Sequence, residues 1–191
     1  MNICLYGASS NTIDKEYIQK VEELGRMMVE RGHNLVFGGG AQGLMGAAAR
    51  GVFEKKGQIL GVAPKFFEVD GVLFKDCTEF IYTDTMRERK RIMEENSDVF
   101  IVTPGGMGTF EEFFEILTLK QLGRHCKAIV IYNVCGFYDS MEKMMQEAMD
   151  KNFIKPECRE LYEIFDDAEE MLDYIENYKG EKAGAKYFKN I

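Results

Sequence analysis

Short apolar runs alternate with amphipathic stretches along most of the chain, and this alternation predicts its elements. We expect strands where a few apolar residues stand together and helices where apolar residues recur every three or four positions. The expected strands are residues 3–6, 34–37, 58–63, 80–82, 99–102, 128–132 and 161–165. The expected helices are residues 13–31, 44–56 and 86–96, one that starts near 111 and ends near 122, 137–152, and one from a cap at 166–167 to about 178.

The order of these elements predicts one α/β domain, with a parallel sheet and helices on both of its faces. We expect the domain to span residues 1–178 and a polar tail to follow at 179–191. The segment 65–76 has no clear period, so we expect it to be a loop that walls the active site.

Small-residue turns follow three of the expected strands, at 7–10, 38–43 and 105–109. Ligands of parallel sheets bind beyond the carboxyl ends of the strands, so these turns should converge on one site. Each turn alone is explained about as well by tight turning as by ligand binding. The three together favour a phosphate or a ribose.

The segment 103–112, TPGGMGTFEE, joins a glycine turn to a helix start that carries two adjacent carboxylates. Glycine lets the backbone approach a ligand closely, and free N–H groups at a helix N-terminus favour an anion. Side chains of adjacent helical residues point about 100° apart, so only one of Glu111 and Glu112 can face the ligand. The helix macrodipole, which favours acidic residues in a first turn, explains the other.

A carboxylate beside a ribosyl group can stabilise an oxocarbenium-like transition state or position a water molecule. The segment 38–43 contains the GxGxxG spacing, but no acidic residue ends the third strand and no Walker A lysine is present. A mononucleotide or sugar phosphate is therefore favoured over NAD or ATP.

The segment 87–91, RERKR, is the densest basic stretch of a chain whose formal net charge is −8. We expect most of it to lie on a solvated helix face, with the pairs Lys90–Glu94 and Arg91–Glu95. At least one arginine should point into the site and clamp an anion. The acidic balance argues against nucleic-acid binding but allows a small anionic ligand.

The five cysteines are widely spaced and the two histidines are scattered, so we expect neither a disulfide framework nor a metal or cofactor. The first residues lack a basic, then apolar, leader pattern, and no apolar stretch approaches membrane-spanning length. We therefore expect the cytoplasm as its location and no membrane partner.

The segment 104–112 matches the PGGxGTxxE signature of the Lonely guy family, the cytokinin riboside 5′-monophosphate phosphoribohydrolases that are often mislabelled as lysine decarboxylases. The segments 6–10, 38–46, 86–90 and 132–139 resemble further motifs of this family in the same order. The resemblance covers about residues 2–173, and the ordered set is specific.

This resemblance implies a Rossmann-like, doubly wound fold and hydrolysis of a purine nucleoside 5′-monophosphate, with or without an N6 substituent, to free base and ribose 5-phosphate. It implies Arg89 and Glu112 as catalytic residues and a homodimer. The expected substrate contacts are Gly7, Ser9, Gly39, Gly40, Lys90, Gly105, Gly106, Met107, Gly108, Thr109, Glu111 and Thr118. Thr118 can reach a substrate only if the chain bends or a partner subunit brings the substrate near.

Two departures bear on the base. Arg87 stands where the family often has histidine, and residues 65–67, KFF, stand where plant members have a lysine followed by a glutamate. Plain AMP is therefore a candidate beside N6-prenylated AMP. The alternative function is a non-catalytic carrier of a nucleotide or cofactor, which would keep the glycine turns without needing Arg89 and Glu112. Lysine decarboxylation is rejected, because no lysine has a recognisable pyridoxal-phosphate context.

Overall fold

A seven-stranded parallel sheet forms the centre of the computed structural model, which describes residues 1–180. Its strand order is β4-β3-β2-β1-β5-β6-β7. The strands are β1 (Asn2–Tyr6), β2 (Asn34–Phe37), β3 (Ile59–Pro64), β4 (Glu79–Thr83), β5 (Val99–Val102), β6 (Ala128–Tyr132) and β7 (Glu163–Phe165). The predicted tail, 179–191, lies almost wholly outside the described residues.

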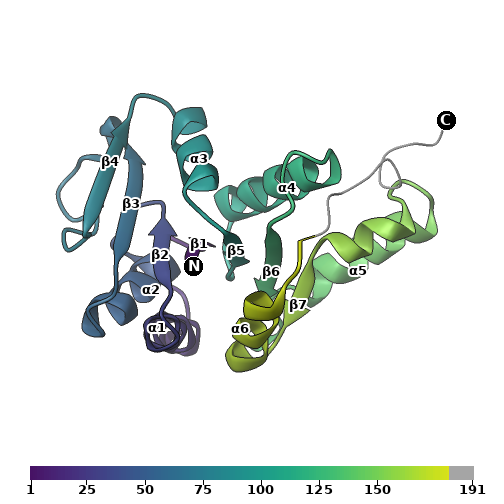
Figure 1. Cartoon of the computed structure of the whole chain (residues 1–191), viewed down its shortest axis with the longest axis horizontal. Coiled ribbons are helices and arrows are strands. Elements are labelled where there is room, and N and C mark those ends of the chain that lie inside the picture. The colour runs from purple at the N-terminus through teal and green to yellow at the C-terminus, as the bar shows by residue number, and fades with distance from the viewer. Residues whose placement is uncertain (181–191) are drawn as a thin grey trace.

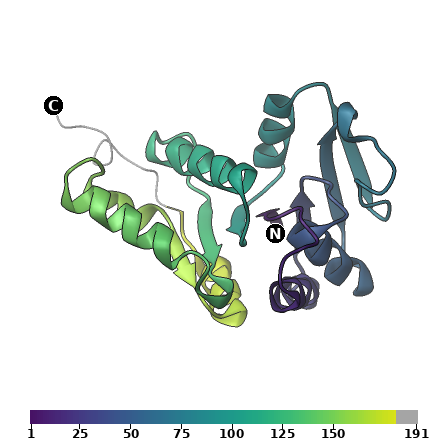
Figure 2. The ribbon, with the colours of Figure 1, turned by 180° about the vertical axis from the view of Figure 1, so that it is seen from behind.

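Helices cover both faces of the sheet (Figures 1 and 2). The α-helices are α1 (Lys15–Glu30), α2 (Gly43–Glu54), α3 (Met86–Glu95), α4 (Met107–Gln121), α5 (Asp139–Asp150) and α6 (Ala168–Asn177). Three 3-10 helices join them, η1 (Lys65–Phe67), η2 (Val134–Gly136) and η3 (Pro156–Leu161). Side chains of α1, α2 and α6 pack in one core layer, and those of α3, α4 and α5 pack in the other.

The side chains of the central strand β1 alternate between the two core layers. Ile3 and Leu5 belong to the core under α1, α2 and α6, whereas Cys4 and Tyr6 belong to the core under α3, α4 and α5. A strand buried on both faces needs a continuous apolar run, and that run is what the sequence shows. The predicted parallel sheet with helices on both faces, a Rossmann-like fold, is therefore confirmed.

Most elements differ from the prediction by one or two residues at an end, and three of these differences have a local cause or consequence. The strand expected at 161–165 begins at Glu163, because η3 takes up the residues before it. The helix expected at 137–152 begins at Asp139, because η2 precedes it and Cys135 there has a φ of 54°. Helix α4 begins at Met107, so its glutamates lie in the second turn, and the macrodipole explanation for one of them is wrong.

The chain reverses its direction of travel across the sheet at β1. Strands β2 to β4 follow on one side of β1, and β5 to β7 follow on the other. The turns after β1 and β5 therefore diverge at a topological switch point, where ligands of such sheets bind. Ala8 N donates to Pro104 O at 3.0 Å and Leu44 N donates to Ala8 O at 2.8 Å, so the three predicted turns converge.

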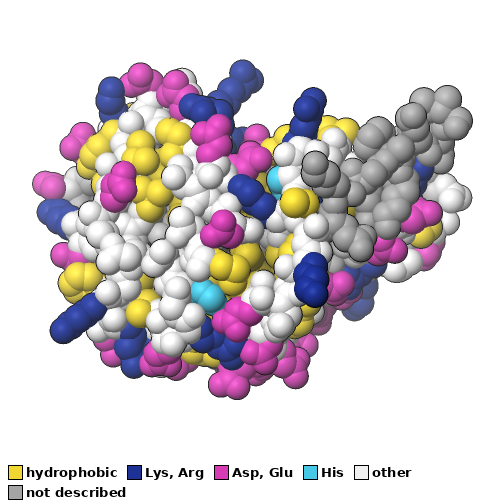
Figure 3. Space-filling view, in the orientation of Figure 1, with side chains coloured by type: hydrophobic (Ala, Val, Ile, Leu, Met, Phe, Trp, Pro, Cys, Tyr) yellow, Lys and Arg dark blue, Asp and Glu magenta, His cyan; other side chains and the backbone are white. Residues whose placement is uncertain are grey.

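Hydrophobic side chains gather over the edge strand β4 on the face shown in Figure 3. The rings of Phe80 and Tyr82 contact each other at a tilt of 37°, with their centroids 4.7 Å apart. Both rings line a groove with the segment 68–77, so aromatic side chains flank the sheet edge next to this loop.

Helices α1 and α2 approach so closely that glycine is required where they touch. A Cβ on Gly51 would lie 2.0 Å from Glu22 O, and a Cβ on Gly25 would lie 2.4 Å from Ala48 O. Both clashes are with backbone atoms, which cannot turn aside.

We predict that Gly51→Ala lowers the free energy of unfolding by about 1–3 kcal/mol, because overpacking costs that much. This loss must exceed the ~1 kcal/mol that alanine gains over glycine in a helix interior. Urea denaturation measures the difference. Gln19→Ala on the exposed side of α1 is the control and should change stability by less than about 0.5 kcal/mol. A Gly51→Ala protein as stable as this control would contradict the packing described.

Candidate functional site

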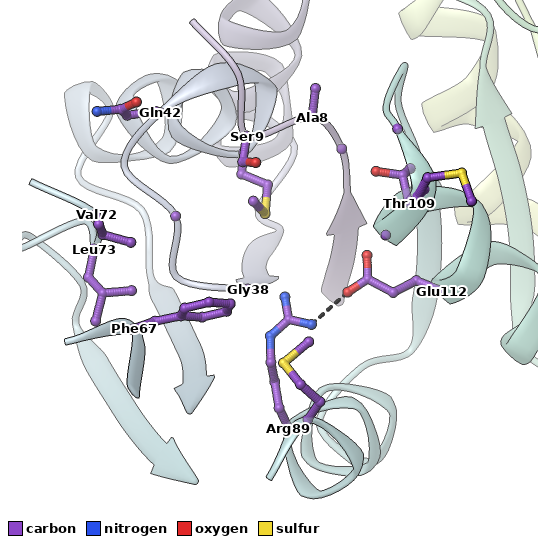
Figure 4. A pocket seen from close by; sticks show the side chains of 17 residues that line it. Ala8, Ser9, Gly38, Gln42, Phe67, Val72, Leu73, Arg89, Thr109 and Glu112 are labelled. Atoms are coloured by element: carbon purple, nitrogen blue, oxygen red, sulfur yellow. Dashed lines mark hydrogen bonds and ion pairs between the residues drawn. The ribbon is translucent and has the colours of Figure 1, made fainter. Parts of the chain in front are cut away.

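A cavity of about 470 Å³ opens at the carboxyl edge of the sheet, where the turns after β1, β2 and β5 meet. Its volume is typical of small-molecule sites. Its two sides differ in chemistry (Figure 4). The side formed by β1, the β5–α4 turn and α4 includes Gly7, Gly106, Gly108, Thr109 and Glu112, and the opposite apolar wall includes Met45, Phe67, Val72, Leu73 and Met86.

The N-terminus of α4 forms a cradle of backbone groups on the first side. Gly106 occupies the cap position, and no side chain among the described residues bonds to the free N–H groups of this end. A Cβ added to Gly106 or Gly108 would meet no described atom within 4 Å, so these glycines face open space. Unpaired N–H groups at a helix start attract an anion, and a phosphate suits this position.

Arg89 enters the cavity because the start of α3 is fixed by a capping box. Thr85 Oγ1 accepts from Glu88 N at 3.2 Å, and Glu88 Oε2 accepts from Thr85 N at 3.2 Å. Arg89 follows directly, and its Nε donates to Val62 O of β3 at 3.2 Å. A Cβ on Gly38 would lie 1.8 Å from Arg89 Nη2, so only glycine at position 38 leaves room for the guanidinium.

Glu112 meets Arg89 inside the cavity, as the dashed line in Figure 4 marks. Arg89 Nη1 donates to Glu112 Oε1 at 2.6 Å, and the two side chains are only 6% and 10% exposed. Burial raises the pKa of Glu112, although the charge and hydrogen bond of Arg89 partly oppose it. A carboxylate with raised proton affinity is better suited to accept a proton from water than an exposed one.

Buried polar contacts join the end of β1, the residue after β5 and the start of α5. Thr103 Oγ1 donates to Tyr6 O at 2.9 Å, and Tyr138 OH donates to Thr103 O at 2.9 Å. A Cβ on Gly7 would lie 2.2 Å from Thr103 Oγ1, so position 7 has no room for a side chain while this contact is kept. These contacts fix the position from which α4 starts, as a preorganised site requires.

The segment 65–76 forms the apolar wall, as its lack of periodicity led us to expect. Ala41 N donates to Val72 O at 2.9 Å and Phe74 N donates to Gly39 O at 2.8 Å, so this segment is tied to the turn after β2. In Figure 4 the ring of Phe67 lies beside Gly38 and Arg89. The wall side chains are uncharged, which suits the flat face of a base.

The structure brings part of the predicted site together. The cavity is lined by the predicted residues Gly7, Ser9, Gly40, Arg89, Gly106, Met107, Gly108, Thr109 and Glu112. The predicted residues Gly39, Lys90, Gly105, Glu111 and Thr118 lie outside this lining.

Each residue outside the lining has a local reason for its place. Gly39 has a φ of +75°, and a Cβ on it would lie 2.7 Å from the ring of Phe80. Gly105 makes room for Thr109, whose Oγ1 would lie 2.1 Å from an added Cβ. Thr118 Oγ1 donates to Phe114 O at 2.7 Å on α4, which continues without a break to Gln121, so the chain does not bend toward the cavity.

The predicted pair Lys90–Glu94 is wrong. Lys90 Nζ lies 2.5 Å from Glu111 Oε1 and 2.7 Å from Glu115 Oε2, so the lysine pairs with α4 and not within its own helix. The predicted pair Arg91–Glu95 is confirmed at 2.9 Å. An i,i+4 pattern identifies a possible partner, but it cannot exclude a closer partner on another element.

Sequence reasoning placed the turns 7–10 and 38–43 and the segment 65–76 at the site, but it did not name as contacts several residues that line the cavity: Ala8, Gly38, Gln42, Met45, Phe67, Val72, Leu73 and Met86. Gly38 carried a signal of its own, since it belongs to the same glycine run as Gly40. Met45 and Met86 lie outside the expected turns and wall, and no physical pattern sets them apart, because core and wall residues look alike in one sequence.

Residues 1–180 contain no group of three or more histidine, cysteine, aspartate or glutamate side chains placed to hold a metal ion. None of the helices in that range has the length and apolar character needed to cross a membrane.

The fold and the cavity together define a Rossmann-like protein with an anion cradle and a buried arginine–carboxylate pair at its switch point. A family model described as possible lysine decarboxylase matches residues 45–175. Arabidopsis thaliana cytokinin riboside 5′-monophosphate phosphoribohydrolase LOG2 is 36% identical over 176 residues, which are 92% of this chain and 83% of the relative. The chain therefore belongs to the Lonely guy family, as its motifs predicted.

One further relative and one solved structure are also similar to this chain. The probable cytokinin riboside 5′-monophosphate phosphoribohydrolase LOGL3 of Oryza sativa subsp. japonica is 34% identical over 175 residues, 92% of this chain and 83% of the relative. The molybdenum cofactor carrier protein of Chlamydomonas reinhardtii has a TM-score of 0.68 at 21% identity, over 92% of this chain and 95% of that one. At this identity the likeness concerns the fold alone.

We predict that Arg89→Met lowers the free energy of unfolding by about 3–5 kcal/mol, because it leaves Glu112 buried without a partner. The double variant Arg89→Met/Glu112→Leu should recover most of this loss, because a buried ion pair can be replaced by apolar groups at little cost. Chemical denaturation of both proteins measures the difference. Equal losses in the single and the double variant would show that the loss does not come from leaving the charge of Glu112 buried without a partner.

Proposed function

We propose that this protein hydrolyses the N-glycosidic bond of a purine nucleoside 5′-monophosphate, releasing the free base and ribose 5-phosphate. The observation that carries this proposal is the buried Arg89–Glu112 pair, which stands in one cavity between a phosphate cradle and an apolar wall. The names of the relatives, phosphoribohydrolases at 34–36% identity over most of the chain, support it.

The two sides of the cavity suggest how the nucleotide lies. The 5′-phosphate would accept hydrogen bonds from the N–H groups at the start of α4, and the base would lie against Phe67 and its apolar neighbours. The ribose then falls between them, where Arg89 and Glu112 meet. This arrangement brings the glycosidic bond to the carboxylate without any movement of the sheet.

The chemistry follows from the charge that develops at C1′. The bond from C1′ to the base nitrogen breaks, and its electron pair leaves with the base. The Glu112 carboxylate stabilises the oxocarbenium-like ribosyl group and orients the water that adds to C1′. The water gives up one proton, which passes through Glu112 to the departing base or to solvent. Arg89 holds Glu112 in place and remains protonated throughout.

The wall bears on which base is accepted. Residues 65–67, KFF, stand where plant members of the family have a lysine followed by a glutamate, and Phe67 lines the cavity. An apolar surface there would recognise the base by stacking and contact area. This surface suits adenine and also tolerates an apolar N6 substituent. We therefore propose AMP and N6-prenylated AMP as the first substrates to test.

The position of Thr118 on α4 bears on the oligomeric state. Because α4 runs straight past the cavity, Thr118 can contact only a nucleotide held by another subunit. We accordingly propose the homodimer that the family resemblance implies, with Thr118 directed at the partner's substrate.

We predict that the wild-type protein releases free base from AMP or isopentenyl-AMP. Glu112→Gln and Arg89→Lys should lower kcat by roughly 10²–10⁴-fold, the contribution of a positioned acid–base group. Chromatography of base and ribose 5-phosphate measures the rates. Arg91→Gln is the matched control, because Arg91 is an exposed neighbour on the same helix. Tight nucleotide binding by the wild type without release of any purine base would favour the carrier function.

We also predict that Phe67→Ala raises KM for AMP about tenfold or more, because stacking on an aromatic ring contributes about 1–3 kcal/mol per base. Its inhibition by ribose 5-phosphate, which has no base, should be unchanged. Phe67→Tyr is the control and should bind AMP like the wild type. Equal weakening of both ligands in Phe67→Ala would place the base elsewhere.

A further inference from the structure

Two ion pairs lie side by side where α3 meets α4. The inner pair is Arg89–Glu112, and the outer contact joins Lys90 to Glu111 and Glu115. Arg89 and Lys90 are neighbours on α3, and Glu111 and Glu112 are neighbours on α4. The outer contact therefore runs beside the inner one: Lys90 is one residue later than Arg89 on α3, and Glu111 and Glu115 stand one residue before and three residues after Glu112 on α4.

Lys90 is well enclosed for a lysine that lies outside the cavity lining. Its side chain is 15% exposed, and two carboxylates that stand one helical turn apart hold its ammonium group at 2.5 Å and 2.7 Å. Burial alone would lower the pKa of Lys90, but the hydrogen bonds to Glu111 and Glu115 outweigh it, so its pKa is raised. Lys90 therefore keeps its positive charge and is paired with both Glu111 and Glu115.

We propose that Lys90 is a positioning residue that clamps α3 to α4 and so holds Arg89 against Glu112. This inference rests on the proposed function and assigns Lys90 and Glu111 a role without contact to the substrate. The geometry supports it, because a rotation or slide of α4 that parts Glu111 from Lys90 also parts Glu112 from Arg89.

The clamp also acts on the charge of Glu112. The charged and titratable groups that influence Glu112 are Arg89 and Lys90 from α3, Glu111 from α4, and Cys4 and Tyr6 from β1. Burial raises the pKa of Glu112, and Arg89 lowers it; Glu111 raises it further, and Lys90 lowers it. Removing Lys90 should therefore raise this pKa, and removing the charge of Glu111 should lower it.

The direction of each shift in the pKa of Glu112 predicts the direction in which the pH dependence of the activity moves. Glu112 works as a carboxylate, so activity is lost as pH falls through its pKa. Lys90→Met should move the acid limb of the kcat/KM profile to higher pH, and Glu111→Gln should move it to lower pH. A lysine that merely stabilised the fold would move neither limb in a fixed direction.

The decisive experiment titrates the Glu112 carboxyl carbon by NMR in the full chain, without substrate, and measures kinetics on the same proteins. We expect the two opposite pKa shifts, and a kcat for Lys90→Met that is roughly 10–100-fold lower with little change in KM, because misplacement of reacting groups by ~1 Å costs up to 10² in rate. Lys90→Arg should restore both values. Arg91→Gln removes the same charge one residue away and should shift neither.

The outcomes separate this inference from the proposed function. Opposite pKa shifts in a protein that releases no base would leave the clamp standing and overturn the hydrolase. An unchanged Glu112 titration in Lys90→Met, with a raised KM and an unchanged kcat, would overturn the clamp and make Lys90 a substrate contact. If Lys90→Met does not fold, Glu111→Gln tests the clamp in its place, because it removes one of the two carboxylates that hold Lys90 and should lower the pKa of Glu112, whereas Lys90→Arg should match the wild type.

Discussion

The contact between Arg89 and Glu112 is the interaction on which the rest of the site depends. Two opposite charges are held 2.6 Å apart and nearly out of water, in an arrangement that is costly unless each charge has its partner. The surrounding structure is arranged to keep that partner in place. The capping box fixes the start of α3, Val62 holds the guanidinium, and Gly38 leaves it room.

The same constraint explains why a buried pair can be reactive. Burial raises the pKa of Glu112, and the charge and hydrogen bond of Arg89 partly oppose this rise. The Glu112 side chain is therefore suited both to act as a carboxylate and to exchange a proton. In the proposed function, the cradle at the start of α4 binds the phosphate and the wall at 65–76 binds the base, one on each side of Glu112. Catalysis and recognition would then both depend on three turns at one edge of the sheet.

Much of the fold and part of the site could be predicted from the sequence. Apolar runs indicate the elements of the fold, and glycines indicate the cradle at the start of α4. Arg89 and Glu112 were identified by motif position, and the structure places them in contact. The partners of Lys90 could not be predicted, because they lie on another helix and no local pattern encodes them. The segment 65–76 was expected to wall the site, but its lining residues could not be predicted, since Phe67 and Leu73 resemble ordinary core residues until the loop is placed.

We propose that the glycosidic bond breaks at the buried pair through a positively charged ribosyl group. A competition between AMP and AMP deuterated at C1′ tests this, with free base and ribose 5-phosphate both quantified. We expect equal amounts of the two products and a slower reaction of the deuterated nucleotide, because the C1′ centre becomes planar in the transition state. Recovery of intact nucleotide bound to the protein, with no base released, would contradict it.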